Sequence, residues 1–143
     1  MARTRAQDFE EKRRVILDCA AQVFAEQGMD KASMSQIAAQ AQVSKALLYH
    51  YYPGKDALIF AIIITHLTEL DRVVAEADDP ALSPDQRLRQ LVGSVLEAYR
   101  GADNEHKVQL NAASTLSETQ REEILTIERR IVRRFSTVLD QLN

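Results

Sequence analysis

Few residues in this 143-residue sequence break or cross-link secondary structure: it has four glycines, three prolines, one cysteine and no tryptophan. So little glycine and proline argues against a turn-rich β-sandwich and against disorder, and predicts an all-α protein. The lone cysteine, Cys19, cannot form an intramolecular disulfide and reads as a buried thiol. The longest apolar run, Ala57 to Ile64, is far shorter than the ~20 residues that span a bilayer. No signal peptide is recognisable, and we expect a cytoplasmic protein without a membrane partner.

The sequence also has no large excess of positive or negative charge. The sequence has 18 Lys and Arg against 21 Asp and Glu, a net charge of -3, which alone argues against a nucleic-acid partner. The charges are unevenly distributed, however. Up to Lys55 there are eight basic residues against six acidic ones, so the remainder of the chain is distinctly acidic. Any anionic partner is therefore expected to meet the N-terminal third.

The N-terminal third predicts three helices. Asp8 is expected to cap the first, which shows apolar residues at three- and four-residue spacing and ends at Gly28, a residue suited to the left-handed position past a helix end. Ser33 begins an S-x-x-Q capping box for a short second helix. Ser44 can cap a third helix over residues 45–52.

Longer helices are predicted after Pro53 and Gly54. They cover residues 55–77, a segment from Pro84 to Arg100, a shorter segment over 106–115, and a last helix that begins with a capping box at Ser117. Two of these helices carry apolar stripes expected to face the core: Leu88, Leu91, Val92, Val95, Leu96 and Tyr99 in one, and Ile124, Ile127, Ile131, Phe135, Val138 and Leu142 in the other.

Two short helices joined by three or four residues have the geometry of a helix-turn-helix, whose second helix enters the major groove of B-DNA. At about 100° per residue, Leu48 and Tyr52 lie on one side of the 45–52 helix. Ala46, Leu47 and His50 lie on the opposite side. The second helix therefore has one packing face and one face available to a partner.

Three of the four tyrosines cluster at the end of this helix. Tyr52 is expected to pack in the core, whereas Tyr49 and Tyr51 flank the exposed face, where a phenol offers an apolar edge and a hydroxyl. Aromatic packing between short helices is the alternative interpretation. We prefer it for Tyr52 only, because one helix cannot bury its whole circumference.

The segment SMSQIAAQAQVSKALLYHYYPGKDAL, with the preceding VFAEQGMDKAS, resembles the DNA-binding segment of TetR-type transcriptional regulators over roughly residues 10–60. The resemblance implies an N-terminal DNA-binding domain over residues 1–52 and a helical ligand-binding domain over 53–143. It further implies a homodimer that binds a palindromic double-stranded DNA operator, usually as a repressor, and responds to a small-molecule effector. Neither enzymatic activity nor a cofactor is implied.

By position, the resemblance assigns DNA contacts to residues at helix N-termini and along the third helix. Phosphate contacts fall to Ser33 and Lys55, groove-facing positions to Ser35, Lys45, Ala46 and Leu47, and a mixed set of base and phosphate contacts to Tyr49, His50 and Tyr51. A basic N-terminal arm with Arg3 and Arg5 could reach adjacent phosphates or a minor groove.

The sequence departs from the family pattern in three places. The family often has glycine where Gln42 stands, and a left-handed glutamine would cost about 1 kcal/mol unless the turn avoids that conformation. It favours glycine and threonine in place of Ala46 and Leu47, and Leu47 could instead touch a thymine methyl. Family members also typically have two further helices after the one predicted from Ser117, so we expect this chain to be a fragment with its last apolar stripe partly uncovered.

Other functional interpretations stay open. The runner-up is a helical protein-interaction module without DNA binding, and an enzyme ranks third because no nucleophile, phosphate loop or metal-ligand spacing is present. His66, Tyr99 and Asn111 could line a ligand cavity, although satisfied core or interface positions are the simpler interpretation. The arginine run from Arg129 to Arg134 is interpreted as a solvated face beside the apolar stripe.

Overall fold

The computed structural model describes residues 4–112 and 114–143, and within these ranges it contains helices and no strands. The helices are α1 (Arg5–Gln27), α2 (Met34–Ala41), α3 (Lys45–Tyr51), α4 (Lys55–Ala77), α5 (Pro84–Tyr99), α6 (Asp103–Asn111) and α7 (Glu118–Leu142). The all-α prediction is confirmed. None of the described helices is long and apolar enough to cross a membrane.

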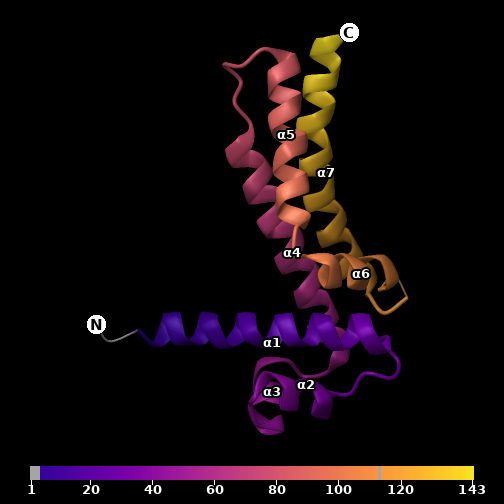
Figure 1. Ribbon diagram of the computed structural model, residues 1–143. Coiled ribbons are helices and arrows are strands. Elements are labelled where there is room, and N and C mark those ends of the chain that lie inside the picture. Colours follow the sequence, from indigo (N-terminus) through magenta and orange to yellow (C-terminus); the bar gives the residue numbers. More distant parts are fainter. Residues whose placement is uncertain (1–3, 113) are drawn as a thin grey trace.

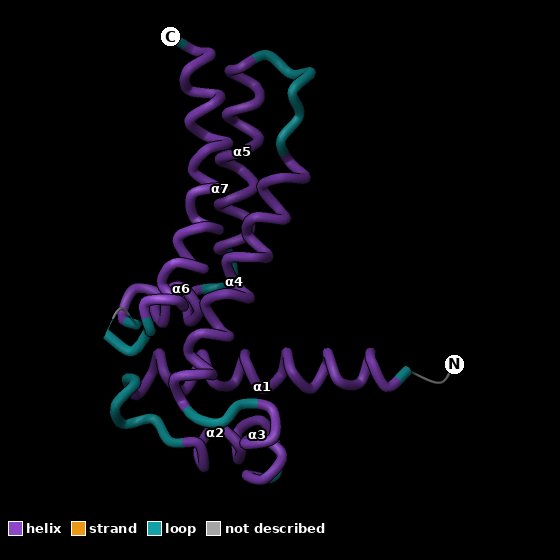
Figure 2. Tube along the Cα trace, turned by 180° about the vertical axis from the view of Figure 1, so that it is seen from behind, coloured by secondary structure: helices purple, strands orange, loops and turns teal. Residues whose placement is uncertain are grey.

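The helices form two parts that meet at α1. Helices α4, α5 and α7 run side by side as a bundle, and α1 crosses its lower end with α2 and α3 beneath (Figure 1). The short α6 packs against both α1 and α4. The view from behind shows the same arrangement, with α4 leading out of the lower part directly into the bundle (Figure 2).

Helix α1 starts earlier than predicted. The Thr4 hydroxyl accepts a hydrogen bond from the Gln7 backbone N–H at 3.1 Å, and the Gln7 side chain accepts one from the Thr4 N–H at 3.0 Å. This capping box satisfies free N–H groups one turn before Asp8, which becomes an acidic residue of the first turn. Arg5 is therefore helical rather than part of an extended arm, and Arg3 lies outside the described residues.

Helix α1 ends at the predicted glycine, although not in the conformation expected. Gly28 has φ 86° and ψ 158°, a positive φ outside the left-handed helical region. Its N–H still donates to the carbonyl of Phe24 at 2.9 Å and so closes the last turn. Glycine is needed here because a side chain would be strained at this φ.

Three of the later boundaries agree with the sequence and two differ. Helix α4 has the predicted bounds, Pro84 is the first residue of α5, and α7 begins with the capping box at Ser117. Helix α3 ends one residue early because Pro53 disfavours a helical conformation at Tyr52. Helix α6 covers Asp103–Asn111 instead of 106–115, and two acidic side chains occupy its first turn.

One contiguous hydrophobic core joins the two parts, and α4 supplies its largest share. Fully buried side chains come from every helix of the chain's described part. The largest are Ile16 and Val23 of α1, Ile37 of α2, Leu48 of α3, Leu58, Ile59, Ile62, Ile63, Leu67 and Val74 of α4, Leu91 of α5 and Val108 of α6, with Val138 of α7 equally buried. A displacement within the bundle therefore has a packed route from α4 to α1, and from α1 to α2 and α3.

Two apolar faces of the bundle are uncovered. On α5, Val92 and Leu96 are 43% and 68% exposed, so the prediction that they face inward is wrong. Helix α5 packs mainly against α4 and α7, and the side of it that carries Val92 and Leu96 is exposed. On α7 the inner stripe is buried as predicted at Ile124, Ile127, Ile131 and Val138, half-buried at Phe135 and exposed at Leu142. A second stripe is exposed at Leu125, Val132 and Leu139.

Candidate nucleic-acid interface

Side-chain caps fix the starts of both short helices. The Ser33 hydroxyl accepts a hydrogen bond from the Gln36 N–H at 3.1 Å, and the Gln36 side chain accepts one from the Ser33 N–H at 2.9 Å. At α3 the Ser44 hydroxyl accepts from the Leu47 N–H at 3.0 Å. Both predicted caps are confirmed. They hold α2 and α3 as separate helices despite lengths of eight and seven residues.

The turn between them adopts the left-handed conformation that glycine prefers. Gln42 has φ 58° and ψ 41°, and it is the one non-glycine residue in the described chain with a positive φ. Its N–H donates to the Ala39 carbonyl at 3.2 Å, and the Val43 N–H donates to the Ala38 carbonyl at 3.0 Å. The turn therefore keeps the helix-ending geometry and accepts the strain of a side chain.

Replacing Gln42 by glycine should stabilise the protein by up to about 1 kcal/mol, because it removes the left-handed strain at an exposed position. The measurement is the free energy of unfolding from urea titration. Ala39→Gly, an exposed position inside α2, is the matched control and should lower stability by about 1 kcal/mol. A loss of stability in Gln42→Gly would contradict the assigned strain.

The inner face of α3 packs as predicted at two positions and differs at a third. Leu48 is fully buried, and Tyr52 is half-buried, with burial raising the pKa of its phenol against an opposing hydrogen bond from Arg13. The ring of Tyr51 stacks on Phe9 of α1 with centroids 5.0 Å apart. This contact with α1 leaves Tyr51 half-buried instead of standing free on the outer face.

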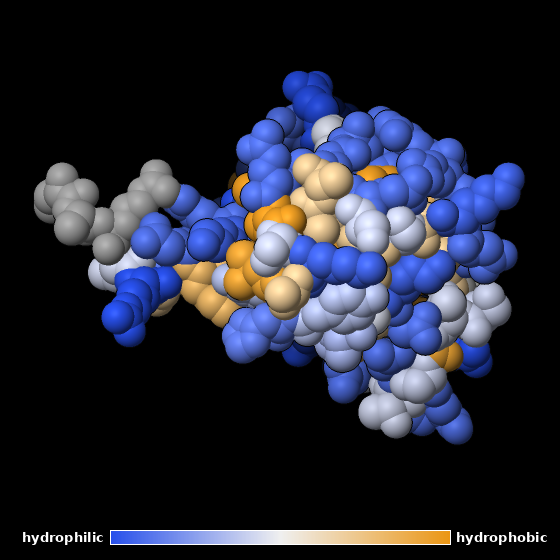
Figure 3. Space-filling model, turned by 90° about the horizontal axis from the view of Figure 1, so that it is seen from below, coloured by the Kyte–Doolittle hydropathy of each residue, from blue (hydrophilic) through white to orange (hydrophobic). Residues whose placement is uncertain are grey.

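The outer face of α3 points away from the core. Lys45, Ala46 and His50 are exposed, Tyr49 is 44% exposed, and Leu47 is half-buried. This lower end of the molecule is mainly hydrophilic, with a small apolar group between the polar side chains (Figure 3). A mixed surface of this kind can donate hydrogen bonds to base edges and phosphates and also contact thymine methyl groups.

An open groove of about 910 Å³ lies beside α3. Ser33, Tyr49 and Lys55 line it, so the structure brings these three predicted residues together. The N-termini of α2 and α4 both open into the groove, and their free N–H groups and dipoles favour an anion. Ser35 is exposed on α2 but does not line the groove, and Lys45 and His50 lie outside it on α3.

Lys55 has a structural partner that the sequence did not predict. Its Nζ donates to the carbonyls of Met29 and Asp30 at 2.8 and 3.3 Å, which ties the start of α4 to the loop after α1. These two bonds leave one of the three ammonium hydrogens available to a phosphate.

Sequence reasoning also missed other residues of the groove. Lys31 lines the groove and adds a positive charge. Its place two residues before the predicted cap Ser33 could have identified it as a phosphate contact. Gln120 comes from the start of α7, more than sixty residues farther along the chain, and no local pattern indicates it. Asp30 and Asp56 also line the groove, so its positive charge is partly balanced.

Inside the bundle, His66 and Tyr99 meet as proposed for a ligand cavity, but Asn111 does not join them. The Tyr99 ring lies between two histidines, 5.4 Å from His66 and 5.0 Å from His106 by ring centroids. Asn111 is exposed and donates to the Lys107 carbonyl at 2.8 Å.

The polar groups of this cluster are not all hydrogen-bonded, as the simpler interpretation assumed. In the described part of the chain, four buried polar atoms have no hydrogen-bond partner: His66 Nε2, His106 Nδ1, Glu105 Oε2 and Gln109 Oε1. Burial raises the pKa of Glu105, and the nearby charge of Asp18 on α1 adds to the effect. Residues 4–112 and 114–143 hold no group of three or more His, Cys, Asp or Glu side chains placed for a metal ion.

His66 should make stability depend on pH. Burial, and then the charge of His106, lowers its pKa below the ordinary 6.5. The unfolded chain therefore binds the proton more tightly, so the contribution of His66 is complete above about pH 6.5 and is lost as the pH falls toward the lower folded value. His66→Phe keeps an aromatic contact with Tyr99 and removes the titration. Between pH 8 and pH 5 the free energy of unfolding should therefore fall more for the wild type than for His66→Phe. An equal fall in both proteins would contradict this assignment.

Two short capped helices with a left-handed turn between them, beneath a long helix that leads into a bundle, define a helix-turn-helix protein with an appended helical domain. Comparisons with known proteins agree. Residues 16–62 match the family described as bacterial regulatory proteins, tetR family, and residues 81–143 match the tetracyclin repressor-like C-terminal domain. A TetR-family transcriptional regulator from Bordetella parapertussis is 31% identical, with a TM-score of 0.81 over 91% of this chain and 68% of that one. The chain belongs to the TetR family of transcriptional regulators.

Two further relatives have more specific names. The HTH-type transcriptional regulator BetI of Brucella canis is 36% identical over 81 residues, which are 57% of this chain and 41% of that protein. The chain thus matches about two-fifths of the length of this curated relative. The structure of AibR in complex with isovaleryl coenzyme A and operator DNA is 28% identical, with a TM-score of 0.77 over 91% of this chain and 71% of that chain.

Proposed function

We propose that this protein is a ligand-responsive transcriptional regulator that represses by binding a palindromic operator through α3. The observation that carries the proposal is the outer face of α3, where Lys45, Ala46 and His50 are exposed on a helix that is capped at its start and anchored by Leu48. A rigid helix with such a face suits the major groove.

Each predicted contact has a place in this docking. Ser33 and Lys55 hold one backbone phosphate at the groove between the N-termini of α2 and α4, with Lys31 beside them. Ser35 of α2 faces the major groove beside α3. Base edges are met by Lys45, Ala46, Leu47 and His50, and the two tyrosines Tyr49 and Tyr51 contribute hydroxyls at the edge of the helix.

We assign residues 1–52 to DNA binding and 53–143 to regulation, and we propose a homodimer in the full-length protein. A dimer places two copies of α3 about one helical turn of DNA, ~34 Å, apart and so matches a palindrome. The relative crystallised with operator DNA supports DNA binding, and its bound isovaleryl coenzyme A supports a small-molecule effector. Such a protein acts in the cytoplasm.

We place the unidentified effector at the polar cluster of the bundle. His66, His106, Glu105 and Gln109 each have a buried polar atom without a partner, and a ligand with polar groups would satisfy them. Three of these side chains lie on α6, which packs against α1. A ligand that prefers one position of α6 and α4 would thereby change the half-site spacing and the operator affinity.

Selection from random duplexes tests the proposal. The chain should enrich a palindromic sequence, and its affinity should fall steeply as salt rises, because phosphate contacts release counterions. Salt-sensitive binding without sequence preference would support a DNA-binding unit that does not pair. Absence of binding at low salt would reject the function.

A protein-interaction module is the second candidate, and the exposed apolar stripe of Leu125, Val132 and Leu139 on α7 favours it. The two candidates use different surfaces, the outer face of α3 and the outer side of bundle helix α7 (Figure 1). Substitutions at Lys45 and His50 should therefore abolish function only under the first.

A further inference from the structure

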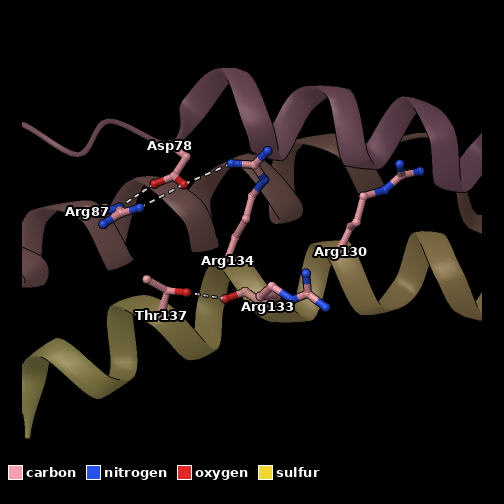
Figure 4. A pocket seen from close by; sticks show the side chains of 6 residues that line it. All are labelled: Asp78, Arg87, Arg130, Arg133, Arg134 and Thr137. Atoms are coloured by element: carbon pink, nitrogen blue, oxygen red, sulfur yellow. Dashed lines mark hydrogen bonds and ion pairs between the residues drawn. The ribbon is translucent and has the colours of Figure 1, made fainter.

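A cluster of arginines surrounds a small cavity at the end of the bundle far from α2 and α3. The cavity has a volume of about 320 Å³ and lies where α4 ends, α5 begins and α7 passes beside both. Its lining consists of Asp78, Arg87, Arg130, Arg133, Arg134 and Thr137 (Figure 4). Sequence reasoning treated the arginines of α7 as a solvated face and gave no role to Arg87.

Asp78 holds two of these arginines in place. Arg87 donates to both of its carboxylate oxygens, through Nε to Oδ1 and through Nη2 to Oδ2 at 3.1 Å. Arg134 donates to Oδ2 from the other side at 3.1 Å (Figure 4). These bonds, that of Arg87 above all, hold the pKa of Asp78 below its usual range, and its side chain is 6% exposed. Asp78 thus accepts three hydrogen bonds and fixes the two guanidinium groups.

The remaining positive charge is not neutralised. Arg130 forms a longer ion pair with Asp71 at 3.5 Å, and Arg133 has no ion pair with any described residue. Both guanidinium groups stay clear of Asp78 (Figure 4). Four guanidinium groups therefore line the cavity. Two carboxylates, Asp78 and Asp71, form ion pairs with them, and the charge of Asp79 also acts on Arg87. The cavity keeps a surplus of positive charge in a protein whose net charge is -3.

A merely solvated arginine face does not explain this arrangement. Arg87 is 9% exposed and comes from a different helix, yet it lines the same cavity as three arginines of α7. Arg129 belongs to the same sequence run but is exposed outside the cavity. Arginine is seldom buried, so holding Arg87 at this place concentrates positive charge instead of dispersing it.

We propose that this cavity binds the phosphate or pyrophosphate group of a small molecule. One planar carboxylate is satisfied by one or two guanidinium forks, as Asp78 already demonstrates. Arg130, Arg133 and the free edges of Arg87 and Arg134 need an acceptor with more oxygens and a higher charge, which a phosphate group supplies. The Thr137 hydroxyl donates its one hydrogen to the Arg133 carbonyl at 2.9 Å, so the guanidinium groups are the donors that this cavity offers to an anion. The site is distinct from the candidate DNA interface, because the end of α4 and the start of α5, which line it, lie far from α2 and α3 (Figure 1).

Titration of the ¹⁵N-labelled 143-residue chain with sodium pyrophosphate at constant ionic strength tests the proposal. Saturable shifts are expected at the backbone amides of residues 130–137 and 87, and acetate at the same concentrations should produce none. The double variant Arg130→Gln with Arg133→Gln removes two exposed guanidinium groups and leaves the bonds of Asp78 intact. It should weaken pyrophosphate binding about tenfold or more.

Arg129→Gln removes one positive charge from the same helix outside the cavity and is the matched control for the single variant Arg133→Gln. It should change the affinity by less than about twofold. Equal weakening in the control would mean general charge attraction and would overturn the site. So would shifts confined to residues 31–56, which would place the anion in the groove beside α3. Equal binding of acetate would overturn the phosphate assignment, and absence of saturable shifts would overturn the proposal as a whole.

Discussion

Replacing Lys45 and His50 together by alanine is expected to lower the affinity for a selected operator by about two orders of magnitude. Each side chain is exposed on the outer face of α3, and each lost base or phosphate contact costs about 1–3 kcal/mol. The fold should be unchanged, because neither side chain packs in the core. Fluorescence anisotropy with the selected duplex measures the affinity, and circular dichroism checks the fold.

The control for this pair is Lys107→Ala, which removes an exposed lysine of α6 away from the proposed interface. It should change the affinity by less than about threefold, and that change should vanish as salt rises. If the control weakened binding as much as the α3 variant, the interface would not be at α3. Wild-type affinity in the Lys45 and His50 variant would lead to the same conclusion.

Leu48→Ala should lower the free energy of unfolding by about 3 kcal/mol. Leu48 is fully buried beneath α3, and removing a buried leucine side chain loses both its transfer free energy and the contacts around the cavity left behind. Because α3 has only seven residues, it depends on this anchor to stay helical. Urea denaturation measures the change, and operator binding should disappear with it.

Leu96→Ala is the matched comparison, since this leucine is 68% exposed on α5. Its removal should change the free energy of unfolding by less than about 0.5 kcal/mol. A large loss at Leu96 would mean that the uncovered face of α5 is buried in solution. A small loss at Leu48 would contradict the packing of α3.

Local chemistry made much of this fold predictable. The serines at 33, 44 and 117 act as caps where the sequence placed them, and Pro84 starts α5, because capping depends on atoms within one turn. The separation of packing and outer faces on α3 followed from helical periodicity. The same reasoning missed the Thr4 capping box, although its T-x-x-Q pattern is visible in the sequence.

What could not be predicted depends on neighbours far along the chain. Tyr51 packs on Phe9 because α1 crosses above α3, and Lys55 bonds to the loop after α1. Arg87 meets Arg134 across 47 positions of sequence through a carboxylate that belongs to neither helix. Periodicity says which face of a helix is apolar, but it cannot say which neighbour covers that face, and so Leu96 was placed inside.

The most direct test of the central claim is to map the amide chemical shifts of the ¹⁵N-labelled chain on adding the selected duplex. We predict the largest changes at residues 33–35, 44–51 and 55, with little change along the second half of α7. Such a pattern would place the outer face of α3 and the adjoining groove on DNA. Changes concentrated on α5 and α7, with α3 unaffected, would contradict the proposed function and favour a partner that binds the bundle.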